Sequence, residues 1–157
     1  MSLQFLHTMI RISDPAASLK FFCDGLGMQL VKKVDVEPAR FSLYFLATPK
    51  DVERMGGIDD EARPTATDIP MIELTHNWDE EGYEGGRNFG HLAYRTPNIY
   101  ETVEHLAAMD ITINRPPRDG RMAFVKSPDG ISVELLQDGA PLEPKEPWAS
   151  AENIGSW

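Results

Sequence analysis

The pattern of apolar strands in this sequence occurs twice, and this internal repeat limits the possible folds more than any other feature. Each half begins with a short apolar strand that carries a histidine, continues through a helix and three further strands, and has a glutamate in its last strand. Glu73 follows His7 by 66 residues, Glu134 follows His91 by 43, and the difference of 23 is the length of segment 48–70. Self-similarity within a chain indicates a repeated supersecondary unit. It predicts an α+β fold built from two βαβββ modules.

Local signals place the elements of each half. Asp14-Pro15 is typical of a helix start, with aspartate as the N-cap and proline in the first turn. Asn98 and Glu101 have the spacing of a capping box before a second helix. Alternation of apolar and polar side chains predicts the strands. The predicted strands are 4–12, 28–36, 41–47 and 71–78 in the first half, and 89–96, 111–114, 122–126 and 131–137 in the second.

These elements divide the chain into a first module, 1–78, and a second module, 89–137, which together make one domain of ordinary size. An acidic, glycine-rich linker, 79–88, joins them. Segment 48–70 is polar, contains proline and glycine, and has no sustained period, so we expect an insertion on the surface with at most one helical turn. The tail, 138–157, contains several prolines and is expected to be irregular.

The repeated histidines and glutamates predict a divalent metal site. Glu73 lies in the middle of the apolar strand 71–78, and a carboxylate there is costly to bury without a cation or proton partner. His7, His91 and Glu134 occupy short apolar strands in the same way. Because side chains alternate along a strand, His7 shares a face with Arg11, and Glu73 shares a face with Asn77. Imidazole and carboxylate donors suit zinc, nickel or cobalt.

Composition limits the partners and the compartment. The net charge of −10 argues against nucleic acid or an anionic membrane as the main partner. No run approaches the roughly 20 apolar residues of a membrane span, and the amino terminus lacks the pattern of a signal peptide. The single cysteine, Cys23, excludes an intramolecular disulfide and is more typical of a packed helix residue than of a nucleophile. We therefore expect a soluble, cytoplasmic protein.

Several motifs are spread over residues 6–136. They are Leu6-His-Thr-Met-Ile-Arg11, Asp14-Pro15 with Ser18-Leu19, Leu26-Gly-Met28, Phe41-Ser-Leu-Tyr-Phe-Leu-Ala47, Glu73-Leu-Thr-His-Asn-Trp78, Phe89-Gly-His91, Ser127-Pro-Asp-Gly130 and Glu134-Leu135. Together they resemble the vicinal oxygen chelate superfamily and, within it, the glyoxalase I (lactoylglutathione lyase) family. Glu73–Trp78 together with Phe89–His91 is the most specific match, whereas Ser127–Gly130 is common across the superfamily.

The resemblance implies the site residues and the assembly. It implies one divalent metal ion held by His7, Glu73, His91 and Glu134, in a site formed between the modules at the interface of a homodimer. It implies Arg11, Asn77 and Arg87 as contacts to the glutathione portion of a substrate. A lysine often found near the last hairpin is replaced here by Arg118 or Arg121. Phe41, Leu43 and Phe45 are candidates for the apolar side of the pocket.

The resemblance also implies the reaction. The substrate is the hemithioacetal of methylglyoxal and glutathione, and the product is S-lactoylglutathione, formed through an enediolate whose charge a metal ion stabilises. A glutamate removes the carbon-bound proton. Glu134 is favoured as this base, and Glu73 is expected to act as the base for the other enantiomer of the substrate. Such general-base catalysis contributes about 10²–10⁴-fold.

Two cues disagree on the metal. His7 as first ligand resembles the nickel- or cobalt-activated members, whereas the 23-residue insertion resembles the zinc-activated class.

Among competing functions, a metal-dependent epimerase acting on another thioester needs the same proton abstraction. A non-catalytic binding protein of this fold needs no four-ligand set. An extradiol dioxygenase uses two histidines and one carboxylate, so the second carboxylate argues against it.

Overall fold

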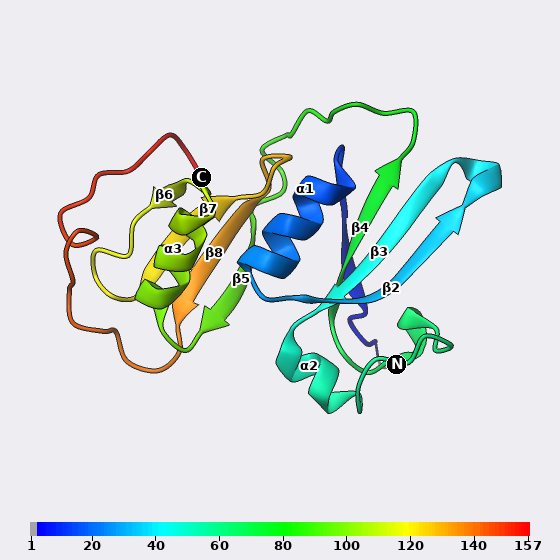
Figure 1. Cartoon of the computed structure of the whole chain (residues 1–157), viewed down its shortest axis with the longest axis horizontal. Helices are drawn as coiled ribbons and strands as arrows, with labels where there is room; N and C mark the ends of the chain where they lie inside the picture. Colours follow the sequence, from blue (N-terminus) through cyan, green and yellow to red (C-terminus); the bar gives the residue numbers. More distant parts are fainter. Residues whose placement is uncertain (1–2) are drawn as a thin grey trace. The chain divides into compact units, whose positions relative to one another are not determined.

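The computed structural model describes residues 3–157, which form two compact units. The first unit ends at Tyr83, and the second runs from Glu84 to Trp157. Each unit contains its own four-stranded sheet (Figure 1). Because each unit has its own sheet and core, each is described separately.

The sheet of the first unit has the strand order β1-β4-β3-β2. β1 and β4 are parallel, and the other neighbours are antiparallel. A helix that starts as α1 and continues as the π-helix η1 connects the first two strands. The bounds are β1 His7–Arg11, α1 Pro15–Leu19, η1 Lys20–Gly25, β2 Gln29–Val36, β3 Phe41–Ala47 and β4 Met71–Asn77; a 3₁₀ turn, η2 Glu37–Ala39, joins β2 to β3.

The sheet of the second unit repeats this topology with the order β5-β8-β7-β6, in which β5 and β8 are parallel. Its helix α3 packs against β6, β7 and β8. The predicted α+β fold with two βαβββ modules is thereby confirmed (Figure 1). The bounds are β5 His91–Thr96, α3 Ile99–Ala108, β6 Ile113–Arg115, β7 Met122–Lys126 and β8 Ser132–Gln137.

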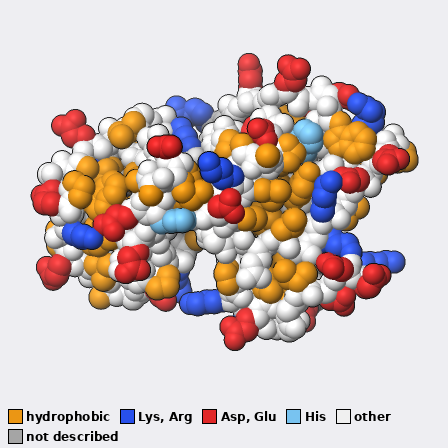
Figure 2. Space-filling view, in the orientation of Figure 1, with side chains coloured by type: hydrophobic (Ala, Val, Ile, Leu, Met, Phe, Trp, Pro, Cys, Tyr) orange, Lys and Arg blue, Asp and Glu red, His pale blue; other side chains and the backbone are white. Residues whose placement is uncertain are grey.

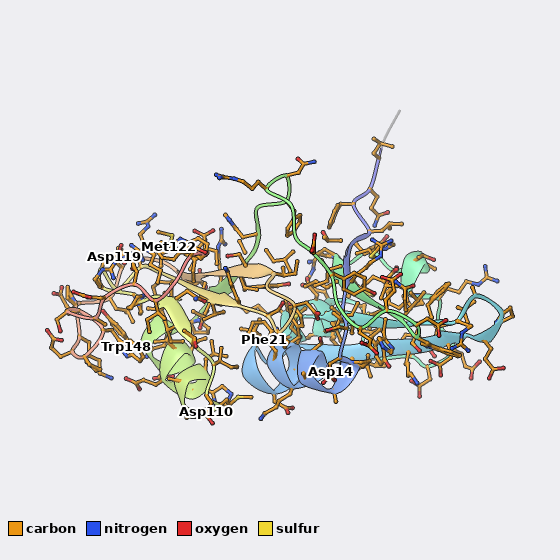
Figure 3. All side chains as sticks on the ribbon, turned by 90° about the horizontal axis from the view of Figure 1, so that it is seen from above. Asp14, Phe21, Asp110, Asp119, Met122 and Trp148 are labelled. Carbon is orange, nitrogen blue, oxygen red and sulfur yellow. The ribbon has the colours of Figure 1, made fainter. Side chains whose placement is uncertain are left out.

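Both predicted helix caps are present. The Asp14 carboxylate accepts the backbone N–H of Ala17 at 3.0 Å, and Asp14 lies at the start of α1 (Figure 3). The Asn98 side chain accepts the backbone N–H groups of Tyr100 and Glu101 and donates to the Glu101 carboxylate. Each cap satisfies N–H groups that have no partner within the helix. The caps therefore fix where the chain leaves β1 and β5.

The two faces of the first sheet differ in character. One face is apolar and buried, because Ile10, Tyr44, Leu46, Ile72 and Leu74 are each at most 8% exposed. The opposite face carries the histidine and glutamate, and we call it the ligand face. Residues paired directly across neighbouring strands point to the same side of a sheet. The ligand face therefore includes His7, Met9, Arg11, Phe41, Leu43, Phe45, Glu73, Thr75 and Asn77.

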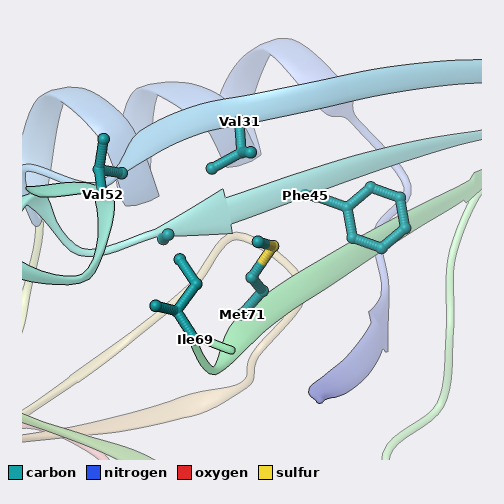
Figure 4. Close-up of a cluster of buried hydrophobic side chains, with 6 residues drawn as sticks. Val31, Phe45, Val52, Ile69 and Met71 are labelled. Carbon is teal, nitrogen blue, oxygen red and sulfur yellow. The ribbon is translucent and has the colours of Figure 1, made fainter. Parts of the chain in front are cut away.

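Segment 48–70 packs into the core more deeply than the sequence predicted. It contains a short helix, α2 (Pro49–Arg54), and a 3₁₀ turn, η3 (Pro64–Ala66). Val52 of α2 and Ile69 are 7% and 3% exposed, and they join a buried cluster with Phe45 and Met71 (Figure 4). Two widely spaced apolar residues give no periodic signal, so their burial could not be inferred from the pattern. The insertion therefore covers one end of the ligand face.

Charge and hydropathy agree with the composition. Acidic side chains are scattered over the face of the molecule seen in Figure 2 and do not gather into one patch. Within residues 3–157, no helix is long and apolar enough to span a bilayer.

Burial, with a smaller contribution from the charge of Asp24, raises the pKa of the Cys23 thiol. A raised pKa lowers the thiolate fraction, which supports the packing role expected for Cys23.

Candidate metal centre

The first predicted ligand pair lies on two neighbouring strands. β1 and β4 run parallel, and their register places Met9 beside Glu73, so that His7 at the start of β1 is close to the glutamate. The His7 Nε2 atom lies 3.3 Å from the Glu73 Oε2 atom. The Glu73 side chain is 14% exposed and the His7 side chain 30%. The pair is thus partly desolvated but accessible at the ligand face.

The second predicted pair repeats this geometry in the other unit. β5 and β8 run parallel with Ala93 beside Glu134, and His91 is the first residue of β5. The His91 Nε2 atom lies 3.2 Å from the Glu134 Oε2 atom. The Glu134 side chain is 16% exposed and the His91 side chain 43%. The same two side chains therefore meet through the same atoms in both repeats.

An aromatic ring completes each pair. Phe45 is the antiparallel partner of Glu73 on β3, and Phe124 is the partner of Glu134 on β7. The His7 and Phe45 rings are edge-to-face with centroids 6.1 Å apart, and the His91 and Phe124 rings are edge-to-face at 5.4 Å. Phe124 was not among the residues singled out from the sequence. Its position opposite Glu134, matching Phe45 opposite Glu73, is the repeat signal that could have found it.

The donor sets fit a divalent metal ion. Each pair offers one imidazole nitrogen and one carboxylate oxygen, 3.2–3.3 Å apart. Two donor atoms that each lie about 2.1 Å from one cation are roughly 3.0–3.4 Å apart at the bond angles of octahedral and tetrahedral coordination. Nitrogen and oxygen donors of this type bind zinc, nickel and cobalt. Both pairs therefore have the chemistry and the spacing of two adjacent ligands.

Neither unit holds a complete site by itself. In the described part of the chain, no three histidine, cysteine, aspartate or glutamate side chains gather around one point. Zinc sites in proteins use three protein ligands when catalytic and four when structural. Each pair is therefore half of the donor set predicted from the sequence.

The two glutamates differ in their next neighbour on the same face. Thr75, two residues after Glu73, is buried, and its hydroxyl donates to the Glu73 Oε1 atom at 3.3 Å. The equivalent residue two after Glu134 is Leu136, which has no hydroxyl. Glu73 therefore accepts a hydrogen bond from the residue two positions later, whereas Leu136 cannot donate one to Glu134.

The candidate substrate contacts of the first unit lie on the ligand face. Arg11 is exposed and is paired with Thr75, so it points to the same side as Glu73. Asn77 lies opposite Phe41 at the end of β4, and its amide donates to the Tyr83 hydroxyl at 3.1 Å. The structure thus brings Arg11 and Asn77 onto the surface that carries the first pair.

The other arginines considered as substrate contacts belong to the second unit. Arg87 is exposed in the linker before β5, and Arg121 is exposed just before β7. Arg118 donates to the backbone oxygen of Ala151 and to the Asn153 side chain. Of the two arginines considered for the lysine position, Arg118 therefore binds the tail, and Arg121 remains the candidate.

Arg95 is a further cation that sequence reasoning did not single out. It follows His91 by four residues, as Arg11 follows His7. Arg95 is exposed, and it lies opposite Leu136 on the same face of the sheet as His91 and Glu134. The same spacing after both histidines was the available signal. Each ligand pair therefore has an arginine on its own strand.

Comparisons with known proteins agree with this arrangement. Residues 4–135 match the Glyoxalase/Bleomycin resistance protein/Dioxygenase superfamily. The chain is 37% identical to the lactoylglutathione lyase of Pseudomonas aeruginosa, over 85% of this chain and 81% of that protein. It is 36% identical to a probable lactoylglutathione lyase of Synechocystis, over 84% and 93%. The trypanothione-dependent glyoxalase I of Leishmania major has a TM-score of 0.71 at 32% identity, covering 87% of both chains.

The fold, the repeated pairs and these matches together define the class of protein. The chain belongs to the Glyoxalase/Bleomycin resistance protein/Dioxygenase superfamily. Within that superfamily, the relatives above are lactoylglutathione lyases and a glyoxalase I. The resemblance identified from the sequence is therefore confirmed.

Proposed function

We propose that this protein is a metal-dependent lactoylglutathione lyase, or glyoxalase I. It converts the hemithioacetal of methylglyoxal and glutathione to S-lactoylglutathione and thereby removes methylglyoxal. The observation that carries the proposal is the pair of His–Glu contacts at equivalent positions of two repeated sheets. The lactoylglutathione lyases at 36–37% identity favour this reaction over an epimerase or a non-catalytic binding protein.

His7, Glu73, His91 and Glu134 would together hold one divalent ion. Each unit supplies two donors, and joining the two pairs gives the four donors of a complete site. Imidazole nitrogen and carboxylate oxygen donors make zinc, nickel and cobalt the candidates here. When bound, the ion supplies positive charge that stabilises the negative charge developing on adjacent substrate oxygens.

Glu134 acts as the base that removes the carbon-bound proton and returns it to the neighbouring carbon. Its carboxylate lacks the restraint that Thr75 places on Glu73, which supports a role that requires movement. Glu73 acts as the base for the other enantiomer of the hemithioacetal. Both carboxylates are largely, but not fully, buried, so that a substrate can reach them.

Arginines and one asparagine bind the glutathione portion. Guanidinium groups form strong, often bidentate hydrogen bonds to carboxylates, and glutathione carries two carboxylates. The position of Arg11 and Asn77 on the ligand face supports this role. Arg87 and Arg121 are exposed cations of the second unit that would provide further contacts.

The active form would be a homodimer in which the ligand pairs of two chains combine. The incomplete donor set of each unit among the described residues and the preference of soluble oligomers for two-fold symmetry support this assembly. The cytoplasmic location expected from the sequence stays a prediction.

The test is an assay on protein stripped of metal by a chelator. Zinc, nickel and cobalt are added back separately, and thioester formation from methylglyoxal and glutathione is followed by ultraviolet absorbance. The proposal predicts activity that depends on one of these metals and on Glu134. Protein that binds metal tightly, yet forms no thioester with any of the three ions, would move the epimerase and binding-protein alternatives ahead.

A further inference from the structure

The tail of the chain returns to the second ligand pair. The Trp157 indole stacks on the Phe124 ring with centroids 5.9 Å apart and an interplanar angle of 29°. Phe124 in turn meets the His91 ring edge-to-face at 5.4 Å. An aromatic row therefore connects residue 157 to a predicted metal ligand 66 positions earlier in the chain.

Hydrogen bonds hold the tail in this position. The backbone N–H of Ile154 donates to the Asn114 carbonyl at 2.8 Å, and the Asn114 amide donates to the Ile154 carbonyl at 2.9 Å. Arg118 donates to the Ala151 carbonyl and to the Asn153 side chain, both at 2.9 Å. Three of these four bonds use main-chain atoms of Ala151 or Ile154, so the segment before Gly155 is held mainly through its backbone.

A glycine then directs the chain toward Phe124. Gly155 has a φ of +66°, in the left-handed region that residues with a Cβ rarely adopt. It stands between the anchored Ile154 and the stacked Trp157. The Lys126 ammonium lies 3.5 Å from the Ser156 hydroxyl in the same turn. Gly155 and Ser156 therefore form a turn that places the Trp157 indole against the Phe124 ring.

The first unit supports the equivalent phenylalanine in a different way. Phe45 is 5% exposed in the cluster with Val52 and Ile69, both from segment 48–70. The second unit has no such insertion, because a short turn at 127–131 joins β7 to β8. A segment outside the βαβββ repeat thus joins the cluster that contains Phe45 in the first unit, and in the second unit the tail stacks on Phe124 directly.

We propose that Trp157 is a positioning residue for metal binding: it holds Phe124 and, through Phe124, the imidazole of His91. The proposal rests on the metal site of the proposed function, but not on the identity of the substrate. Partners that orient a metal-ligating histidine raise affinity because they restrict its ring. The Trp157 side chain remains partly exposed, 42% for the whole residue, so its removal should affect the pair more than the stability of the fold.

The first experiment measures cobalt(II) affinity of the full chain without substrate, by competition with a chromophoric chelator. Trp157→Ala should weaken binding on the order of tenfold, and Trp157→Phe, which keeps an aromatic ring, should restore most of it. Ile154→Ala is the matched control, because Ile154 is 57% exposed and anchors the tail through its backbone. Thermal unfolding of each metal-free variant shows that it is folded.

The second readout is intrinsic fluorescence. The measurement uses a Trp78→Phe background, because Trp78 directly follows the strand of Glu73. Cobalt(II) bound beside His91 should quench Trp157, so adding Trp157→Phe should remove most of the quenching, whereas Trp148→Phe, in the same tail (Figure 3), should retain it. A folded Trp157→Ala variant that binds cobalt as tightly as the wild type would overturn the proposal. Metal-dependent quenching that persists fully in Trp157→Phe would also overturn it. Absence of lyase activity in the wild type would contradict only the proposed function, since neither readout uses substrate.

Discussion

Glu73 and Glu134 occupy equivalent strand positions, yet one hydroxyl distinguishes them. Thr75 donates to Glu73, whereas Leu136 stands at the corresponding position beside Glu134. A carboxylate that must both approach a metal ion and accept a proton benefits from freedom to rotate. Within the proposed mechanism, this difference favours Glu134 as the main base.

Replacing the two glutamates by glutamine tests this assignment. Glu134→Gln should lower kcat by about 10²–10⁴-fold, the usual contribution of a general base, and Glu73→Gln should lower it less. Steady-state kinetics with the methylglyoxal–glutathione hemithioacetal measures both, with the exposed Glu53→Gln as control. A Glu134→Gln enzyme with the kcat of the wild type, or a larger loss in Glu73→Gln, would contradict it.

At this scale, strand alternation was sufficient to place much of the first unit's site. It put His7 with Arg11 and Glu73 with Asn77, and the observed register brings these side chains to one face. It could not find the contact between Phe124 and Trp157. That contact depends on the path of an irregular tail, and irregular segments have no period from which a path can be inferred.

At the scale of elements, segment 48–70 combines two properties. Its surface is polar, but Val52 and Ile69 enter the cluster that contains Phe45 (Figure 4). The Phe45 ring lies edge-to-face with the His7 ring. Apolar side chains in such a cluster stabilise the fold in proportion to the area they bury. The insertion is therefore part of the support of the first ligand pair.

Truncation of Val52 measures that support. Val52→Ala should reduce the free energy of unfolding by about 1–3 kcal/mol, through lost burial and a small cavity. The exposed neighbour Glu53→Ala is the control. Denaturant unfolding gives both values; equal midpoints for Val52→Ala and the wild type would show that the insertion lies on the surface without contributing to the core.

The β2–β3 hairpin contains a carboxylate whose ionisation stabilises the fold. Asp35 accepts hydrogen bonds from the Ser42 hydroxyl at 2.6 Å and the Lys33 ammonium at 2.9 Å, and these bonds lower the pKa of Asp35 below its ordinary 3.8. Trp78 donates to the same Ser42 hydroxyl, so the network also reaches the end of β4. The network links the ends of three strands.

A lowered pKa in the folded state means that the ionised group stabilises the fold above the unfolded pKa and ceases to do so as the pH falls through the folded value. The difference in Tm between the wild type and Asp35→Asn should therefore be present at neutral pH. It should shrink as the pH falls below about 4. Thermal unfolding as a function of pH tests this; a difference that grows on acidification would have the wrong sign.

The repeat predicted the order and type of the elements, and local chemistry predicted the caps at Asp14 and Asn98. Strand bounds were less certain: the strands expected at 4–12 and 89–96 begin at His7 and His91 instead. Exposed residues such as Phe5 and Phe89 continue the apolar pattern without a pairing partner. Hydrogen bonding between strands, which sequence periodicity does not report, decides where a strand begins.

At the scale of the whole molecule, the proposed homodimer makes a specific prediction. One variant carries His7→Ala and Glu73→Ala, and the other carries His91→Ala and Glu134→Ala. If each site combines the first unit of one chain with the second unit of its partner, a mixed dimer contains one intact site and one fully disrupted site. Mixing two inactive variants should then restore about a quarter of the wild-type activity at statistical exchange.

The assay requires proof that mixed dimers form, which two different affinity tags supply. Each variant alone should remain inactive. Mixed dimers without recovered activity would show that the two pairs of one chain join each other, and the proposed exchange between chains would be wrong.

The central claim is that the two His–Glu pairs form a single metal site, and the number of ions bound per chain tests it most directly. Equilibrium dialysis with metal analysis should find one tightly bound divalent ion per chain in the wild type. Either double variant, His7→Ala with Glu73→Ala or His91→Ala with Glu134→Ala, should lose it, because two remaining donors are too few. A folded double variant that still binds one ion per chain as tightly as the wild type would contradict the claim.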